Sequence, residues 1–186
     1  MTVLFLQRLK EVGKKKTRVV PCCLTLLNAC LGFFAVLAAT NQEYGFASLC
    51  IILAACMDML DGRIARALGV ASILGKELDS LSDAISFCLA PAIMFYCWRE
   101  AWHPMISAVV SCTYLAAGLL RLARFNSSMQ SVSTTFCGLP TPAAAIACAL
   151  LIMYNVPTAH GIYYVSVGTL TLALLMVSKL SFPSFK

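Results

Sequence analysis

The chain has 186 residues, of which 60% are hydrophobic and only 12% are charged. A soluble domain with this many hydrophobic residues would need more charged residues to cover its surface. The composition therefore excludes a soluble globular protein and predicts an integral membrane protein. At about 20 residues for each span plus short loops, the length allows one domain of about six spans.

The first 18 residues differ from the rest of the chain. Val3, Leu6, Leu9 and Val12 recur at helical spacing. The basic residues of this stretch are Arg8, Lys10, Lys14, Lys15, Lys16 and Arg18. The pattern predicts a short amphipathic helix that lies on an anionic membrane surface, with a disordered basic leader as the alternative.

Six apolar segments follow. They lie near residues 21–40, 46–66, 77–97, 104–124, 140–156 and 161–179. The first is longer than the apolar core of a signal peptide, which spans about 7–15 residues, so we expect it to be retained. The predicted fold class is therefore an all-α integral membrane protein, with an amphipathic juxtamembrane helix at 1–18 and a domain of six transmembrane helices at 19–186.

The basic residues are divided unequally between the two sides of the membrane that six spans define. Of the 14 lysines and arginines, only Arg99 falls on the side opposite the N-terminus. The positive-inside rule then places both termini in the cytoplasm, which requires an even number of spans. Aromatic residues gather at the opposite helix ends, as in an interfacial belt. They are Tyr44, Trp98, Trp102, Tyr154, Tyr163 and Tyr164.

The ten cysteines predict neither a disulfide framework nor a zinc site. No two of them have C-x-x-C spacing, and Cys22 and Cys23 are adjacent. Those inside apolar runs are Cys30, Cys50, Cys56, Cys88, Cys112 and Cys148. We expect free thiols that pack as small hydrophobic groups.

Every aspartate of the chain lies between positions 58 and 83. Asp58 and Asp61 are three residues apart at the end of the second segment, so they share one helical face. Asp79 and Asp83 are four apart at the start of the third segment and share a face in the same way. Because the two helices are joined by a short connection and run antiparallel, we expect all four carboxylates at a similar depth, just inside the cytoplasmic surface. An ionisable residue within a span is costly and marks a functional site.

Four neighbouring carboxylates repel one another strongly in a medium of low dielectric constant, so they must take up protons or hold cations. Oxygen ligands favour Mg2+, Mn2+ or Ca2+ over zinc. Two ions about 3.5–4 Å apart would suit this number of ligands and phosphoryl chemistry. The predicted cofactor is therefore a divalent metal, either Mg2+ or Mn2+, with Ca2+ as an alternative. We expect two ions in the site.

Small residues and an arginine lie between the two pairs of acids. Gly62, Ala65 and Gly75 let a bulky group approach the backbone closely, and Arg66 supplies a positive charge suited to a phosphate oxygen. Together with a metal, these residues indicate a substrate that carries phosphate. Two alternatives are open: the acids pair with nearby basic residues to hold the helices together, or they mark an ion or proton path through a transporter.

These residues form one continuous pattern, Asp58-x-x-Asp61-Gly62-x-x-Ala65-Arg66-x8-Gly75-x-x-x-Asp79-x-x-x-Asp83. The pattern resembles the signature of the CDP-alcohol phosphotransferase family, and every fixed position matches. The resemblance implies that the four acids bind two metal ions, which hold the diphosphate of a CDP-linked donor, and that Asp83 is also the general base. The residues that it implies at the nucleotide are Gly62, Ala65, Arg66 and Gly75, with Pro21 and Thr25 of a P-x-x-x-T element.

Three further stretches resemble one branch of that family, the membrane-bound phosphatidylserine synthases. They are residues 78–87, 121–126 and 138–144. This branch implies transfer of a phosphatidyl group from CDP-diacylglycerol to the hydroxyl of L-serine, giving phosphatidylserine and CMP. Glycerol 3-phosphate and inositol phosphate are the alternative acceptors, and an ion- or proton-coupled transporter is the alternative class. Cys22 departs from the branch, in which asparagine is common after the proline.

The carboxylate of serine has candidate partners in the fourth segment. Arg121 and Arg124 are three residues apart on one helical face at its cytoplasmic end, where they could clamp a carboxylate or a lipid phosphate. Asn126 lies in the same stretch and could complete the pocket. Ordinary positive-inside anchoring is the alternative for both arginines.

The expected partners are CDP-diacylglycerol and serine as substrates and the lipid bilayer, with no nucleic acid. The resemblance also implies a homodimer. The expected location is a bacterial or archaeal cell membrane, which the chain crosses several times, with the active site facing the cytoplasm.

Overall fold

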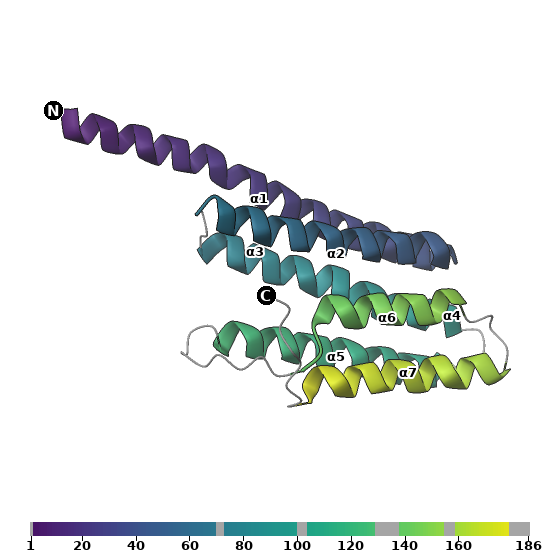
Figure 1. Cartoon of the computed structure of the whole chain (residues 1–186). Coiled ribbons are helices and arrows are strands. Elements are labelled where there is room, and N and C mark those ends of the chain that lie inside the picture. The colour runs from purple at the N-terminus through teal and green to yellow at the C-terminus, as the bar shows by residue number, and fades with distance from the viewer. Residues whose placement is uncertain (1, 70–72, 100–103, 129–137, 155–158, 179–186) are drawn as a thin grey trace.

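The computed structural model describes residues 2–69, 73–99, 104–128, 138–154 and 159–178 (Figure 1). In these ranges every secondary-structure element is helical. The elements are α1 (Thr2–Thr40), α2 (Tyr44–Ala67), α3 (Ile73–Asp83), the π-helix η1 (Ala84–Leu89), α4 (Ala90–Arg99), α5 (Pro104–Ser128), α6 (Thr141–Tyr154) and α7 (Ala159–Val177). The all-α prediction is therefore confirmed for the described residues.

The helices pack side by side (Figure 1). When α3, η1 and α4 are taken together as one rod, successive rods run in alternating directions. α1 lies along α2 at one side of the bundle, and its N-terminal half extends beyond the other helices. α3, η1 and α4 follow one another as a single rod, which packs against α1 on one side and against α5 on the other. The rod thus joins the α1–α2 pair to the group formed by α5, α6 and α7.

α1 is one unbroken helix of 39 residues that contains Pro21. A proline within a membrane helix is tolerated when other groups satisfy the backbone that it frees. The helix predicted for the first 18 residues is present, but no interruption separates it from the first predicted span. The proposed boundary after residue 18 is therefore not a break in secondary structure.

Within the part of the chain that the structure describes, four helical stretches are long and apolar enough to cross a membrane. They are Pro21–Thr40, Tyr44–Ala67, Ile73–Trp98 and Pro104–Ser127. The fifth and sixth predicted spans correspond to shorter apolar helices, Thr141–Tyr154 and Tyr163–Val177. A helix of 14 residues such as α6 is about 21 Å long, which is less than the hydrocarbon thickness of about 30 Å. The described residues thus support a membrane protein in which four helices are long enough to span, and they do not confirm the predicted number of six.

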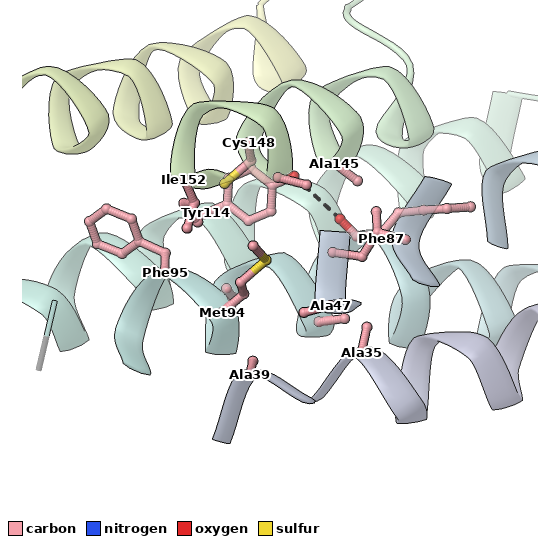
Figure 2. Close-up of a cluster of buried hydrophobic side chains, with 14 of the residues drawn as sticks. Ala35, Ala39, Ala47, Phe87, Met94, Phe95, Tyr114, Ala145, Cys148 and Ile152 are labelled. Carbon is pink, nitrogen blue, oxygen red and sulfur yellow. Dashed lines mark hydrogen bonds between the residues drawn. The ribbon is translucent and has the colours of Figure 1, made fainter. Parts of the chain in front are cut away.

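The apolar core lies where the α3–η1–α4 rod meets α5 and α6 (Figure 2). Phe87, Met94, Phe95 and Tyr114 are fully buried there. The Tyr114 hydroxyl donates to the carbonyl oxygen of Phe87 at 3.3 Å, so the polar atom of the ring is paired. On the α1–α2 side the buried hydrophobic residues are mostly alanines, which let the helix backbones approach closely without a bulky side chain between them.

The nine described cysteines are all free, as the spacing predicts. Cys137 lies outside the described residues. Cys50, Cys88 and Cys148 are buried, and Cys50 and Cys148 belong to the hydrophobic core.

Candidate active site

Three of the four aspartates converge between α2 and α3. Asp58 and Asp61 lie in the C-terminal half of α2, and Asp79 lies on α3. One carboxylate oxygen from each of the three lies within 4.8 Å of those from the other two. The predicted approach of the two pairs of acids is confirmed for these residues.

Asp83 lies at the end of α3, beside this cluster. The Asp58 carboxyl is within hydrogen-bonding reach of both Asp79 and Asp83. On its other side, Asp83 Oδ1 accepts a hydrogen bond from Asn28 Nδ2 at 3.4 Å. Asp83 therefore borders the three converging acids and also contacts α1.

The donor set fits a divalent cation. Asp58, Asp61 and Asp79 supply only oxygen atoms, which are the ligands that Mg2+ and Mn2+ prefer. Asp79 Oδ1 is buried and has no hydrogen-bond partner among the described residues, so it is available as a ligand. Three like charges at this separation repel one another, and a bound cation would relieve the repulsion.

The basic residues nearby are more exposed than the acids of this cluster. Arg63, Arg66 and Lys76 are all exposed, while Asp61 is buried at 4% exposure. The unpaired oxygen of Asp79 also argues against a purely structural pairing of acids with bases. The geometry favours a binding site over a set of ion pairs.

α1 brings Thr25 of the predicted Pro21–Thr25 pair against the cluster. The Thr25 hydroxyl oxygen lies 2.7 Å from Asp61 Oδ2 and 2.9 Å from the carbonyl oxygen of Pro21. A hydroxyl has one proton to donate, so these two acceptors share it. Thr25 thus orients Asp61, a role that the pattern of residues alone did not indicate.

The predicted glycine face is open. A Cβ placed on Gly62 would meet only the guanidinium nitrogens of Arg66, at 4.0 Å. Ala65 and Gly75 are half-buried, on α2 and in the first turn of α3. A phosphate group could approach the backbone of α2 here, next to Asp61 and within reach of the exposed Arg66.

The three residues predicted at the acceptor diverge. Arg121 is half-buried and interacts electrostatically with Asp83, and its Nε is buried with no hydrogen-bond partner among the described residues. Arg124 Nη1 donates instead to the carbonyl oxygen of Val177 at the end of α7, at 3.0 Å. Asn126 Nδ2 donates to Ser80 Oγ at 2.9 Å and so links α5 to α3. Of the three, Arg121 is the one that interacts electrostatically with an acid of the site.

Asn28 was not singled out from the sequence, and Ser82 and Ser86 were noted only as part of the stretch that resembles one branch of the family. Asn28 is fully buried beside Asp83, and Ser82 and Ser86 are buried on either side of that acid. A signal was present, because polar side chains inside an apolar span are unusual and mark functional positions. The sequence gives no sign, however, of which helix such a side chain would face.

Comparison with known proteins places these observations in a family. The model of the CDP-alcohol phosphatidyltransferase family matches residues 18–178. A CDP-diacylglycerol–serine O-phosphatidyltransferase of Bacillus subtilis is 35% identical over 167 residues, which cover 90% of this chain and 91% of that protein. One of the same name from Helicobacter pylori is 31% identical, over 89% of this chain and 72% of the relative.

An archaeal protein is similar as well. An archaetidylserine synthase of Methanothermobacter thermautotrophicus is 32% identical over 165 residues, which cover 88% of this chain and 69% of the relative. The family match spans the described helices from the end of the basic stretch to α7. It includes all four aspartates. The chain therefore belongs to the CDP-alcohol phosphatidyltransferase family.

Proposed function

We propose that this chain transfers the phosphatidyl group of CDP-diacylglycerol to the hydroxyl of L-serine, giving phosphatidylserine and CMP. The convergence of Asp58, Asp61 and Asp79 beside the open face of Gly62 is the observation that carries the proposal. The relatives support serine as the acceptor, because the bacterial enzymes and the archaetidylserine synthase share serine in their names and differ in the lipid. The names of the relatives therefore support serine as the acceptor more strongly than they support diacylglycerol as the lipid part of the donor.

A divalent metal fits the family and the donor set. Asp58, Asp61 and Asp79 would hold it, with Asp83 at the border of the same cluster. We infer Mg2+ or Mn2+, with Ca2+ as the alternative, and two ions in the complete site. When bound, the metal neutralises the donor diphosphate and the charge that develops on the leaving CMP.

The donor head would lie along the open face of α2 and the start of α3. Arg66 would bind a phosphate oxygen, since its guanidinium is exposed beside Gly62. Thr25 would keep Asp61 oriented while the diphosphate is bound. The residues that we place around the nucleotide are Pro21, Thr25, Gly62, Ala65, Arg66 and Gly75.

Asp83 is our candidate for the general base. Its carboxylate would take the proton from the serine hydroxyl, and the freed oxygen would attack the lipid-side phosphorus. The bond from that phosphorus to CMP would break, so that one ester forms as one phosphoanhydride is lost. Arg121, which lies near Asp83, is placed to bind the serine carboxylate. Arg124 and Asn126 are assigned to the rim of the acceptor site.

We infer that all six apolar helices cross the membrane and that both termini are cytoplasmic. The alternating directions of the rods support this, as does the gathering of thirteen of the fourteen basic residues on one side of such a topology. The acids would then open to the cytoplasmic face of a cell membrane. Residues 1–18 would form the juxtamembrane part of α1, ahead of a catalytic domain at 19–186, and the working unit would be a homodimer.

Two other acceptors and one other class have a basis in the residues. Glycerol 3-phosphate or inositol phosphate would also need positive charge, which Arg121 and Arg124 could supply. A transporter would also place acids inside spans. The gathering of all four aspartates in two neighbouring helices favours an enzyme over a conduction path.

Release of CMP tests the proposal. The purified protein would be mixed with CDP-diacylglycerol micelles, Mn2+ or Mg2+, and one acceptor at a time. We expect CMP with serine and little with glycerol 3-phosphate or inositol phosphate. CMP release with another acceptor alone would reassign the substrate, and none with any acceptor would contradict the enzyme assignment.

A further inference from the structure

A buried amide on α1 contacts the carboxyl that the proposed reaction uses as its base. Asn28 has no exposed surface, and its Nδ2 donates to Asp83 Oδ1 at 3.4 Å. Its Oδ1 is also buried, and no described residue donates a hydrogen bond to it. Burying an amide with half of its hydrogen bonding unmet is costly. Leucine has a similar size and would avoid that cost, so packing alone does not explain an asparagine at this position.

The joint between α1 and the α3–η1 rod is held by other groups. Ser82 Oγ donates to the carbonyl oxygen of Thr25 at 2.7 Å, and Ser86 Oγ donates to that of Asn28 at 2.8 Å. Both hydrogen bonds end on the main chain of α1, so they set its register against the rod without the Asn28 side chain. Gly32 completes the joint, because a Cβ there would lie 2.7 Å from Ser86 Cα.

The joint aims two side chains at two acids. Thr25 and Asn28 are three residues apart and share one face of α1. The first contacts Asp61 and the second contacts Asp83. On the rod, this face of α1 contacts Ser82, which directly precedes Asp83, and Ser86, which lies three residues after it. A shift of α1 would therefore move both contacts together.

We propose that Asn28 is a positioning residue for Asp83. A carboxyl group rotates about a broad, two-fold torsion, and ionised acids beside Asp83 repel it. The amide of Asn28 holds Oδ1 toward α1, so the other oxygen is directed away from α1, toward the cluster between α2 and α3. The acceptor hydroxyl must arrive there for its proton to be taken. The inference rests on the proposed function and adds a residue to it.

Asn28→Leu tests this role, because leucine keeps the volume and removes the donor. Thr169→Val is the matched control: Thr169 is fully buried on α7, far along the chain from the acids, and its hydroxyl donates to the carbonyl oxygen of Val165 at 2.8 Å. Steady-state kinetics in detergent micelles would give kcat and both KM values, and a melting curve would give Tm. We expect Asn28→Leu to lower kcat by about 10–100-fold, with KM for CDP-diacylglycerol unchanged and with a Tm no lower than that of Thr169→Val.

The outcomes separate the positioning role from other roles. A kcat equal to that of the wild type would overturn the proposal, as would a raised KM for serine at unchanged kcat, which would make Asn28 an acceptor ligand. If Asn28→Leu does not fold, Asn28→Ala decides, because it removes the Nδ2 donor without adding a polar group and should lose kcat as well. Failure of both variants to fold would assign Asn28 to structure alone. A wild-type protein that releases no CMP would instead reject the proposed function.

A double-mutant cycle distinguishes a positioning role of Asn28 from a purely structural one. If Asn28 acts through Asp83, the Asn28→Leu change should cost little further kcat in an Asp83→Asn background, because residues that act as a unit are not additive. The same fold loss in both backgrounds would show that the two residues act independently and would overturn the proposal.

Discussion

The contact between α1 and η1 holds Thr25 and Asn28 at the acids, and Gly32→Ala tests it. A Cβ at Gly32 would lie 2.7 Å from Ser86 Cα, a backbone atom that no rotamer change can move. At Gly118 the atom nearest to a new Cβ would be Cys88 Sγ, at 2.6 Å, which is the end of a side chain. Gly118→Ala is therefore the matched control, because it adds the same methyl group to the same helical core.

The magnitudes favour a clear difference between the two variants. Overpacking a core costs about 1–3 kcal/mol, and replacing glycine by alanine inside a helix recovers about 1 kcal/mol. The rigid contact at Gly32 places its cost near the upper end, so the net loss is about 2 kcal/mol, or roughly 4–8 °C in Tm for a chain of this length. At Gly118 the thiol of Cys88 can rotate, and the two effects nearly cancel.

Thermal unfolding in detergent would measure both variants, and CMP release would report on the site. We expect Gly32→Ala to lower Tm and kcat together, because moving α1 away from η1 lengthens the hydrogen bond from Ser86 to the Asn28 carbonyl. Adding Cys88→Ala should relieve what destabilisation Gly118→Ala does cause. A Tm for Gly32→Ala equal to or above that of Gly118→Ala would refute the reasoning.

Three other variants test the acids and the acceptor site. Asp79→Asn should abolish metal-dependent CMP release and weaken Mn2+ binding measured by electron paramagnetic resonance. Glu77 is an exposed neighbour on α3, and Glu77→Gln should change neither. Equal losses in the two variants would contradict a metal site at this cluster. Asp83→Asn should lower kcat by about 10²–10⁴-fold with donor binding retained, and near-normal turnover would rule out the base. Arg121→Lys should raise KM for serine, because an ammonium cannot make the paired hydrogen bonds of a guanidinium; an unchanged KM would leave Arg121 as a membrane anchor.

The acid cluster was predictable because its geometry follows from local rules. Spacings of three and four residues place each pair on one helical face, and a short connection makes the two helices antiparallel. No long-range information was needed to bring Asp58, Asp61 and Asp79 together. Most helix boundaries were predictable from where the apolar segments end, but the predicted break after residue 18 is absent because α1 continues without interruption.

The contacts made by α1 could not be predicted in this way. Thr25 and Asp61 are 36 residues apart in sequence, and Asn28 and Asp83 are 55 apart. Which face of α1 turns toward the acids depends on packing against two other helices, and the apolar pattern of a membrane helix does not distinguish lipid from protein. Arg124 shows the same limit, because its partner is a main-chain carbonyl at the end of α7.

The π-helix η1 explains how one rod serves both the polar site and the apolar core. It begins directly after Asp83, and the N–H of Ala90 donates to the carbonyl oxygen of Ile85, five residues earlier. A π-helical turn adds a residue to the turn, so it rotates the faces of the helix beyond it relative to those before it. Before η1 the rod directs Asp79 toward α2, and beyond it Met94 lies fully buried in the core (Figure 2). The irregular turn thus lies where the rod changes from holding carboxylates to filling the interior. A regular helix at this point could not direct both the acidic face before η1 and the apolar face after it toward their partners.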